Sequence, residues 1–211
     1  MEPDEENSIE EYFDEKINVM ILGDSNVGKS SIITKYCKNE FLPKYIATIG
    51  LDFQMKYLNI NKKKVRLQVW DTAGQERYKV VSKNLFNTSD GFIVIYDITD
   101  RESFNSVNNW IEQIISYVGK DVKCVIFGNK NDLDNKRKVE INEGNELANK
   151  FKFKFFETSA KEGNNLEEGF KSLAFDIMGN IKSVKERRHN SNTSMLKPQN
   201  RSKLKNDKKC C

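Results

Sequence analysis

The stretch GDSNVGKS, from Gly23 to Ser30, has two glycines separated by four residues and followed by Lys and Ser. The residues around its start, INVMILGD from Ile17, form a short apolar and β-branched run that predicts a buried strand. The residues that follow, KSSIITKYC, place four side chains on one stripe of a helix: Ile32, Ile33, Tyr36 and Cys37. A strand, a glycine-bounded loop and a helix start in this order predict a phosphate-binding loop.

In such a loop, the backbone N–H groups of Gly28, Lys29 and Ser30 would face phosphate groups at the N-terminus of a helix. Lys29 would reach the β- and γ-phosphates of a nucleotide, and the Ser30 hydroxyl would be a ligand of Mg²⁺. The plain alternative is a glycine-rich turn with a solvated lysine. The strand and the helix on either side disfavour that alternative.

Charge divides the chain into a body and two tails. Residues 1–16 carry a net charge of −7 and residues 182–211 a net charge of +8, against +4 for the whole chain. We expect a flexible acidic N-terminal extension over 1–16, a domain over 17–181 and a flexible basic tail over 182–211. Since the basicity belongs to the tail, no nucleic-acid partner is expected. No apolar run is long enough to span a membrane and no signal peptide is evident, so a cytosolic location is expected.

Apolar runs alternate with helical patterns along the body. VRLQVWD, DGFIVIYDIT, DVKCVIFGN and FKFKFFET predict strands, and apolar stripes over 104–118 and 166–177 predict helices. This alternation favours the α/β class, with a mostly parallel sheet covered by helices on both faces. Cys37 and Cys124 are expected to be buried and reduced. In such sheets ligands bind beyond the carboxyl ends of the strands.

Three further motifs lie at predicted strand ends. Asp71 ends VRLQVWD, where a carboxylate can hold Mg²⁺ opposite Ser30. In GNKND, from Gly128 to Asp132, an ionised Asp132 can accept hydrogen bonds from the ring N–H and the amino group of guanine, a pairing that adenine lacks. TSAK, from Thr158 to Lys161, offers the backbone N–H of Ala160 to the guanine oxygen. Each motif alone could be a turn or a helix cap; in this order they predict a guanine-nucleotide site.

Together with Thr48 and WDTAGQE, these motifs resemble those of the Ras superfamily of small GTPases. Within it, ATIGLDF, RLQVWDTAGQER and the terminal CC are similar to the Rab family. The resemblance covers residues 17–181 and the last two residues. It implies a P-loop small GTPase G domain, whose mostly parallel six-stranded sheet has helices on both faces.

The resemblance also implies residue roles. Thr48 would bind Mg²⁺ and sense the γ-phosphate, Phe41 would pack against guanine with the stem of Lys130, Gly74 would sense the γ-phosphate, and Gln75 would orient the attacking water. The catalytic residues are then Gln75 and Lys29, and the Mg²⁺ ligands Ser30, Thr48 and Asp71. The nucleotide-binding residues are Ser25, Asn26, Val27, Gly28, Lys29, Ser30, Ser31, Phe41, Tyr45, Thr48, Gly74, Asn129, Lys130, Asp132, Ser159, Ala160 and Lys161.

The implied activity is slow hydrolysis of GTP to GDP and phosphate, stimulated by a GTPase-activating protein (GAP). Geranylgeranyl groups on Cys210 and Cys211, with the basic tail, would attach the protein to the cytosolic face of an endomembrane. The implied partners are an exchange factor, a GAP, a GDP-dissociation inhibitor, an escort protein, and effectors that bind switch I and switch II. The implied function is a monomeric switch that regulates vesicle-mediated intracellular protein transport.

One segment departs from the Rab pattern. The aromatic triad that shapes Rab effector surfaces would comprise Phe53, Trp70 and a tyrosine, but Leu85 takes the place of the tyrosine in LFNTS. The identity of the effectors therefore cannot be carried over. Two other functions compete with the timed switch: a GTP-bound scaffold that barely hydrolyses, which the intact Gln75 disfavours, and a P-loop kinase or ATPase, which GNKND disfavours.

Overall fold

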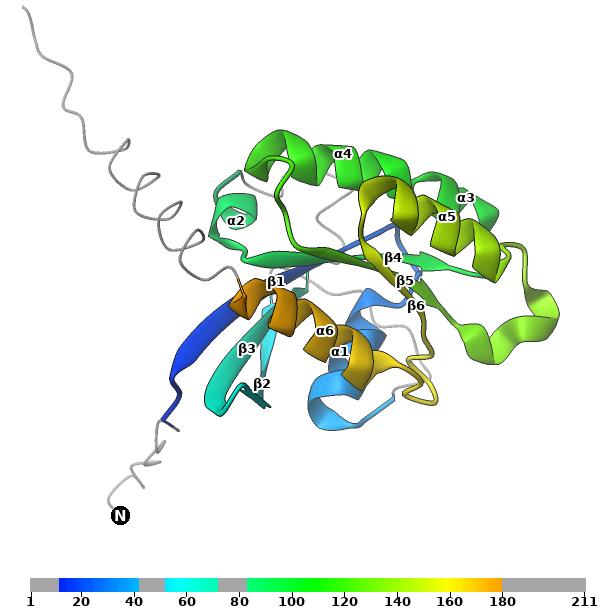
Figure 1. Ribbon diagram of the computed structural model, residues 1–211. Coiled ribbons are helices and arrows are strands. Elements are labelled where there is room, and N and C mark those ends of the chain that lie inside the picture. The colour runs from blue at the N-terminus through cyan, green and yellow to red at the C-terminus, as the bar shows by residue number, and fades with distance from the viewer. Residues whose placement is uncertain (1–11, 42–51, 72–82, 180–211) are drawn as a thin grey trace, which may run out of the picture.

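The computed structural model describes residues 12–41, 52–71 and 83–179 (Figure 1). In this part of the chain, six strands form one sheet in the order β2-β3-β1-β4-β5-β6. Their bounds are β1 Glu15–Leu22, β2 Asp52–Ile60, β3 Lys63–Asp71, β4 Gly91–Asp97, β5 Cys124–Asn129 and β6 Lys154–Glu157. β2 pairs antiparallel with β3, and every other pairing is parallel. The expected mostly parallel six-stranded sheet is confirmed.

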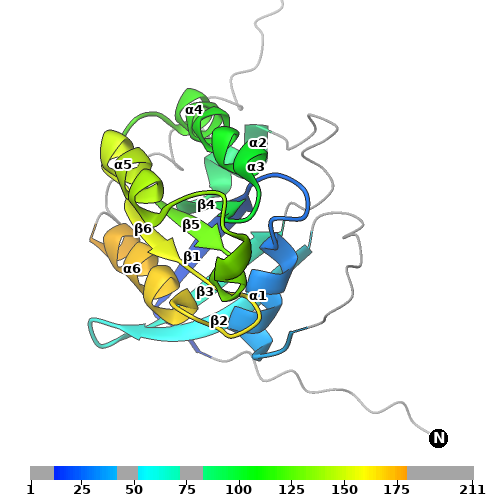
Figure 2. The same cartoon turned by 90° about the vertical axis from the view of Figure 1, so that its right-hand side faces the viewer.

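Helices cover both faces of this sheet, as Figures 1 and 2 show from two sides. α1 (Lys29–Lys38) and α6 (Leu166–Met178) pack on one face. On the other face lie α2 (Lys83–Thr88), α3 (Arg101–Asn105), α4 (Val107–Val118) and α5 (Ile141–Phe151). A short 3₁₀ helix, η2 (Asn131–Lys136), follows β5. No helix in these described ranges is long and apolar enough to cross a membrane.

Burial on both faces explains the sequence of the central strands. Every residue of β4, GFIVIYD, and of β5, CVIFGN, is buried, as expected for parallel strands between two helical layers. On the α1 and α6 side, the ring of Tyr36 stacks on that of Phe170, with centroids 3.9 Å apart and an interplanar angle of 5°. The five apolar residues predicted on the α6 stripe are all buried: Leu166, Phe170, Leu173, Ala174 and Ile177.

Element boundaries differ from the sequence patterns in three places. β1 begins at Glu15, before the expected domain start at residue 17, and just ahead of it the Asp14 N–H donates to the Lys64 carbonyl, 2.8 Å away. β2 does not correspond to a continuous apolar run in the sequence, because it is an edge strand with several exposed side chains. The run FKFKFFET begins at Phe151, which ends α5, so β6 occupies only Lys154–Glu157.

The two cysteines of the described chain are free thiols in different environments. Cys124 is buried, as expected, whereas Cys37 is only half-buried on the flank of α1, which corrects the expectation of full burial. Desolvation raises the pKa of the Cys37 thiol to about 11, although Lys56 and Lys38 act in the opposite direction. The thiol therefore stays protonated at neutral pH and is a weak nucleophile.

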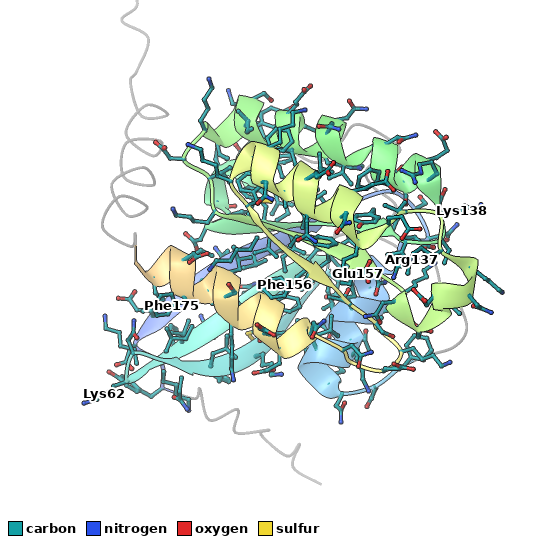
Figure 3. The ribbon with its side chains drawn as sticks, turned by 45° about the vertical axis from the view of Figure 1, so that its right-hand side comes forward. Lys62, Arg137, Lys138, Phe156, Glu157 and Phe175 are labelled. Carbon is teal, nitrogen blue, oxygen red and sulfur yellow. The ribbon has the colours of Figure 1, made fainter. Side chains whose placement is uncertain are left out.

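The core against α6 can be tested with two phenylalanines of that helix. Phe170 is 1% exposed and Phe175 is 54% exposed. Figure 3 labels Phe175 on α6. We expect Phe170→Ala to lower the free energy of unfolding by about 3–5 kcal/mol, because it leaves a cavity and removes the stack on Tyr36. Phe175→Ala is the matched control and should change it by no more than about 0.5 kcal/mol. Urea unfolding followed by circular dichroism measures both; equal losses would contradict this account of the core.

Candidate functional site

The predicted motifs meet where the parallel strands end. β1 lies between β3 and β4 in the sheet, so the loop from Gly23 to Gly28 leaves β1 at the point where the strand order reverses. Asp71, at the end of β3, pairs in register with Ile21 near the end of β1. Figure 2 shows this edge of the sheet, where the start of α1, η2 and the loop after β6 come together.

Two glycines shape the loop between β1 and α1. Gly23 has φ of 144°, and a Cβ atom there would lie 2.2 Å from the carbonyl oxygen of Ile95 on β4. Gly28 has φ of 99°, and a Cβ atom there would lie 2.4 Å from Nδ2 of Asn129. Both positions therefore require glycine. α1 begins immediately after Gly28, and the first-turn amides of a helix, with no acceptor inside the helix, suit an anion.

The Lys29 ammonium lies within this loop. Its Nζ donates to the carbonyl oxygens of Gly23, at 2.7 Å, and Asp24, at 2.8 Å. The residue is only 3% exposed, so its charge acts in a medium that screens it less than water does. Lys29 thus places a positive charge beside the amides that begin α1.

The Asn129 carboxamide joins three loops. It is fully buried: Nδ2 donates to the carbonyl oxygen of Val27 at 2.8 Å, and Oδ1 accepts from the Ala160 N–H at 3.1 Å. The Thr158 hydroxyl also contacts Oδ1, at 3.4 Å. From the sequence, the Ala160 N–H is expected to donate to the guanine oxygen. In the structure this N–H donates to Oδ1 of Asn129. A bound base would have to share this N–H with Asn129 or take it over.

Lys130 links the GNKND segment to the same loop. Its backbone is left-handed, with φ of 70°, and its Nζ donates to the Asn26 carbonyl at 2.8 Å. The ammonium also pairs with Oδ2 of Asp97, 2.6 Å away at the end of β4. The other oxygen of Asp97 accepts from the N–H and the hydroxyl of Thr99, at 2.8 and 2.7 Å. The Lys130 stem therefore bridges from β5 to the loop after β1.

A hydrogen bond from the TSAK segment orients the Asp132 carboxylate. Its Oδ1 accepts from the Ser159 hydroxyl at 2.7 Å, and Ser159 Oγ in turn accepts from the Glu162 N–H at 3.0 Å. The Asn131 N–H donates to the Thr158 carbonyl at 3.0 Å, which holds the two segments together through the backbone as well. Such a carboxylate can receive the two neighbouring N–H donors of guanine.

Two contacts of the site were missed by sequence reasoning. Trp110 of α4 donates from Nε1 to Oδ1 of Asp24 at 2.8 Å, which fixes the direction of the one acidic side chain in GDSNVGKS. Trp110 lies beside the apolar stripe of its helix, and nothing in the local sequence signals the contact. The second contact is the ion pair of Asp97 with Lys130. Asp97 did carry a signal in the sequence, because it is a carboxylate at a strand end, as Asp71 is.

The remaining predicted residues fall into two groups. Ser25, Asn26 and Val27 lie in the loop, Ser30 and Ser31 in the first turn of α1, and Lys161 is exposed after Ala160. Phe41, 38% exposed, lies just beyond α1, and Asp71 is 7% exposed. The residues outside the described ranges are Tyr45, Thr48, Gly74, Gln75, Cys210 and Cys211.

The chemistry of the donors fits Mg²⁺. Ser30 and Asp71 offer hard oxygen atoms from neighbouring segments, and Mg²⁺ commonly takes few protein ligands and completes its shell with water and phosphate. Over residues 12–41, 52–71 and 83–179, no group of three or more His, Cys, Asp or Glu side chains could hold a metal ion.

The residues compared with the Rab effector triad lie on β2, β3 and α2. The rings of Phe53 on β2 and Trp70 on β3 have centroids 5.0 Å apart at an angle of 47°, and Phe53 is 41% exposed. Leu85 of α2 is partly buried against the core on the α2–α5 side of the sheet. Leu85 therefore contributes part of its surface to packing.

Comparison with known proteins points to one family. A model of the Ras family matches residues 18–179. Ras-related protein Rab-13 of Bos taurus is 39% identical over 198 residues, covering 94% of this chain and 97% of that protein. Ras-related protein Rab-3 of Caenorhabditis elegans is 42% identical over 164 residues, covering 78% and 75%. Ras-related protein Rab-8B of Dictyostelium discoideum is 39% identical over 165 residues, covering 78% and 81%.

The role of Asn129 in joining the loops can be measured. Asn129→Ala removes the partners of the Val27 carbonyl and the Ala160 N–H, and each buried group left unsatisfied costs about 1–3 kcal/mol. We therefore expect a clear loss of stability in urea unfolding. The control is Asn164→Ala, because the Asn164 side chain makes its hydrogen bonds at the surface. A similar loss in both variants would argue against Asn129 as the link.

Proposed function

The chain belongs to the Ras family of small GTPases as a Rab-like member, and from this premise we propose that it is a membrane-attached switch in vesicle-mediated intracellular protein transport. In this proposal the protein cycles between GTP-bound and GDP-bound states. The observation that most directly supports nucleotide binding is a pair of hydrogen bonds: Asn129 donates to the Val27 carbonyl and accepts from the Ala160 N–H. They join a loop suited to phosphate with two segments suited to a base.

Guanine would be selected at Asp132. Its carboxylate, oriented by Ser159, would accept from the ring N–H and the amino group of guanine. Adenine has no such pair of donors and would give the Asp132 carboxylate no hydrogen bond from the base, which costs binding energy. Lys130 would cover one face of the base with its stem while its ammonium stays bound to Asp97 and Asn26. Phe41 would contact the base from the end of α1.

Hydrolysis would depend on positioning and charge. Lys29 and the first-turn amides of α1 would neutralise the phosphates, and Gln75 would orient the water whose oxygen attacks the γ-phosphorus as the bond to the β–γ bridging oxygen breaks. Ser30, Thr48 and Asp71 would hold Mg²⁺, which supplies charge neutralisation at the phosphates when bound. Thr48 and Gly74 would sense the γ-phosphate. A GAP would accelerate the slow intrinsic reaction.

Membrane attachment would come from the end of the chain. We assign the GTPase domain to residues 15–181, because β1 begins at Glu15 and not at the expected residue 17. An acidic extension precedes it, and residues 182–211 form a basic tail that ends in prenylated Cys210 and Cys211. Two lipid chains anchor a protein stably where one does not, and the basic residues would add attraction to anionic lipids. An exchange factor, a GDP-dissociation inhibitor, an escort protein and effectors would complete the cycle of a monomeric protein.

Single-turnover release of phosphate from GTP in the presence of Mg²⁺ tests the switch. We expect a rate constant of about 10⁻⁴ to 10⁻² s⁻¹ for the full chain, and a loss of at least about tenfold in Gln75→Leu, which cannot orient the water. Excess ATP should not compete with GTP. Tight GTP binding without release, unchanged by Gln75→Leu, would replace the timed switch with a nucleotide-bound scaffold.

Membrane attachment is tested with the chain produced in eukaryotic cells. Replacing both Cys210 and Cys211 with Ser should shift the protein from the membrane pellet to the supernatant, because both lipid sites are lost. Replacing only one of them should give partial release. Cys37→Ser is the control, and it should leave the distribution unchanged. Equal pelleting of the double variant and the unmodified chain would rule out this anchor.

A further inference from the structure

An arginine–glutamate pair connects the two segments that would bind the base. Arg137 caps the end of η2, and its Nη1 and Nη2 donate to Oε1 and Oε2 of Glu157 at 2.5 and 2.9 Å. The two side chains are only 16% and 10% exposed. Figure 3 shows them together at the end of β6. Glu157 is the last residue of β6 and directly precedes TSAK.

Arg137 also makes hydrogen bonds within η2 and to the segment that follows it. Its Nε donates to Oδ1 of Asp134 at 2.7 Å, its backbone N–H donates to the Asp134 carbonyl at 3.0 Å, and Nη1 reaches the Val139 carbonyl at 2.9 Å. The guanidinium thus makes directed contacts in η2, in the segment after it and at the end of β6. A lysine, with a point charge, could not make the same planar set of contacts.

The other end of η2 is held by the same strand–loop segment. Asn131 donates to the Thr158 carbonyl, and Asp132 accepts from Ser159, so the start of η2 is bound to residues directly after Glu157. The Glu157 carbonyl accepts from Nδ2 of Asn165 at 2.7 Å, which joins this segment to the start of α6. Asp132 therefore lies in a short helix that is fastened to one segment at both ends.

We propose that Arg137 and Glu157 are positioning residues for base recognition, which fix η2 against the TSAK segment so that the Asp132 carboxylate meets both N–H donors of guanine. This inference rests on the proposed binding of guanine nucleotides. An ion pair shielded from solvent contributes little net stability, because the cost of desolvating the two charges offsets their attraction. The two parallel hydrogen bonds from Arg137 to Glu157 nevertheless define the position of one side chain relative to the other. The pair would act through Asp132 without touching the nucleotide.

The test compares GDP with inosine diphosphate (IDP), which lacks only the amino group of the base. Since a hydrogen bond to a charged partner contributes a factor of about 10–100 in affinity, the unmodified full chain should release GDP that much more slowly than IDP. Arg137→Met should lower this ratio of release rates by about threefold or more, because GDP loses two directed contacts and IDP only one. A general loosening of the fold would accelerate both releases equally and leave the ratio unchanged.

Two further variants complete the test. Glu157→Gln keeps the shape of the side chain and should lower the ratio as well, and combining it with Arg137→Met should add little. Arg101→Met is the control: Arg101 forms the same fork with Glu143, at 2.5 and 2.9 Å, and joins α3 to α5. Its other acceptor is the Lys138 carbonyl, beyond the end of η2, so its hydrogen bonds go neither to η2 nor to the TSAK segment. It should leave the ratio unchanged.

The outcomes separate this inference from the proposed function. If the unmodified chain binds neither diphosphate, or binds them equally, guanine recognition itself fails. If it prefers GDP and Arg137→Met or Glu157→Gln retains the full preference, the positioning role alone is overturned. A reduced ratio in Arg101→Met equal to that in Arg137→Met would also overturn it, because the effect would then follow from losing any such ion pair.

Discussion

The buried carboxamide of Asn129 sets the constraint on which the arrangement of the site depends. At its depth water cannot satisfy the amide, so both ends must find partners in the chain, and the partners present are the loop after β1 and the segment after β6. The positions of these two loops are therefore mutually dependent. Gly28 belongs to the same constraint, because any side chain at that position would collide with Asn129.

The charged side chains around this amide define the relative positions of the loops more than they add to the stability of the fold. Lys130 reaches Asp97 and Asn26, and Arg137 reaches Glu157. Lys130 joins the end of β5 to the end of β4, and Arg137 joins the end of η2 to the end of β6. Both contacts are partly or largely shielded from solvent, where attraction and desolvation nearly cancel but direction is retained. Trp110 uses a neutral donor toward Asp24, so α4 is connected to the loop without a further charge. The site is thus a set of loops whose relative positions are fixed by hydrogen bonds from side chains.

Sequence reasoning predicted what is local. GDSNVGKS, GNKND and TSAK each follow a strand that an apolar run reveals, and the rule that ligands bind at strand ends brings them together. Contacts between distant residues carry no such signal: Trp110 and Asp24 are 86 positions apart, and the tie of Arg137 to Glu157 depends on how η2 meets β6. β2 was missed because an edge strand needs no continuous apolar run. The use of the Ala160 N–H by Asn129 depends on a side-chain conformation that no pattern reveals.

The contacts of Lys29 bear on how much free energy an anion can gain in this loop. Its ammonium has the carbonyls of Gly23 and Asp24 as partners within the loop, and the Ala160 N–H likewise has Asn129. An anion in the loop would share the Lys29 ammonium with these carbonyls, and a base would share the Ala160 N–H with Asn129. The free energy gained on binding is then the difference between the new contacts and those already made within the chain, which is smaller than the full strength of either set.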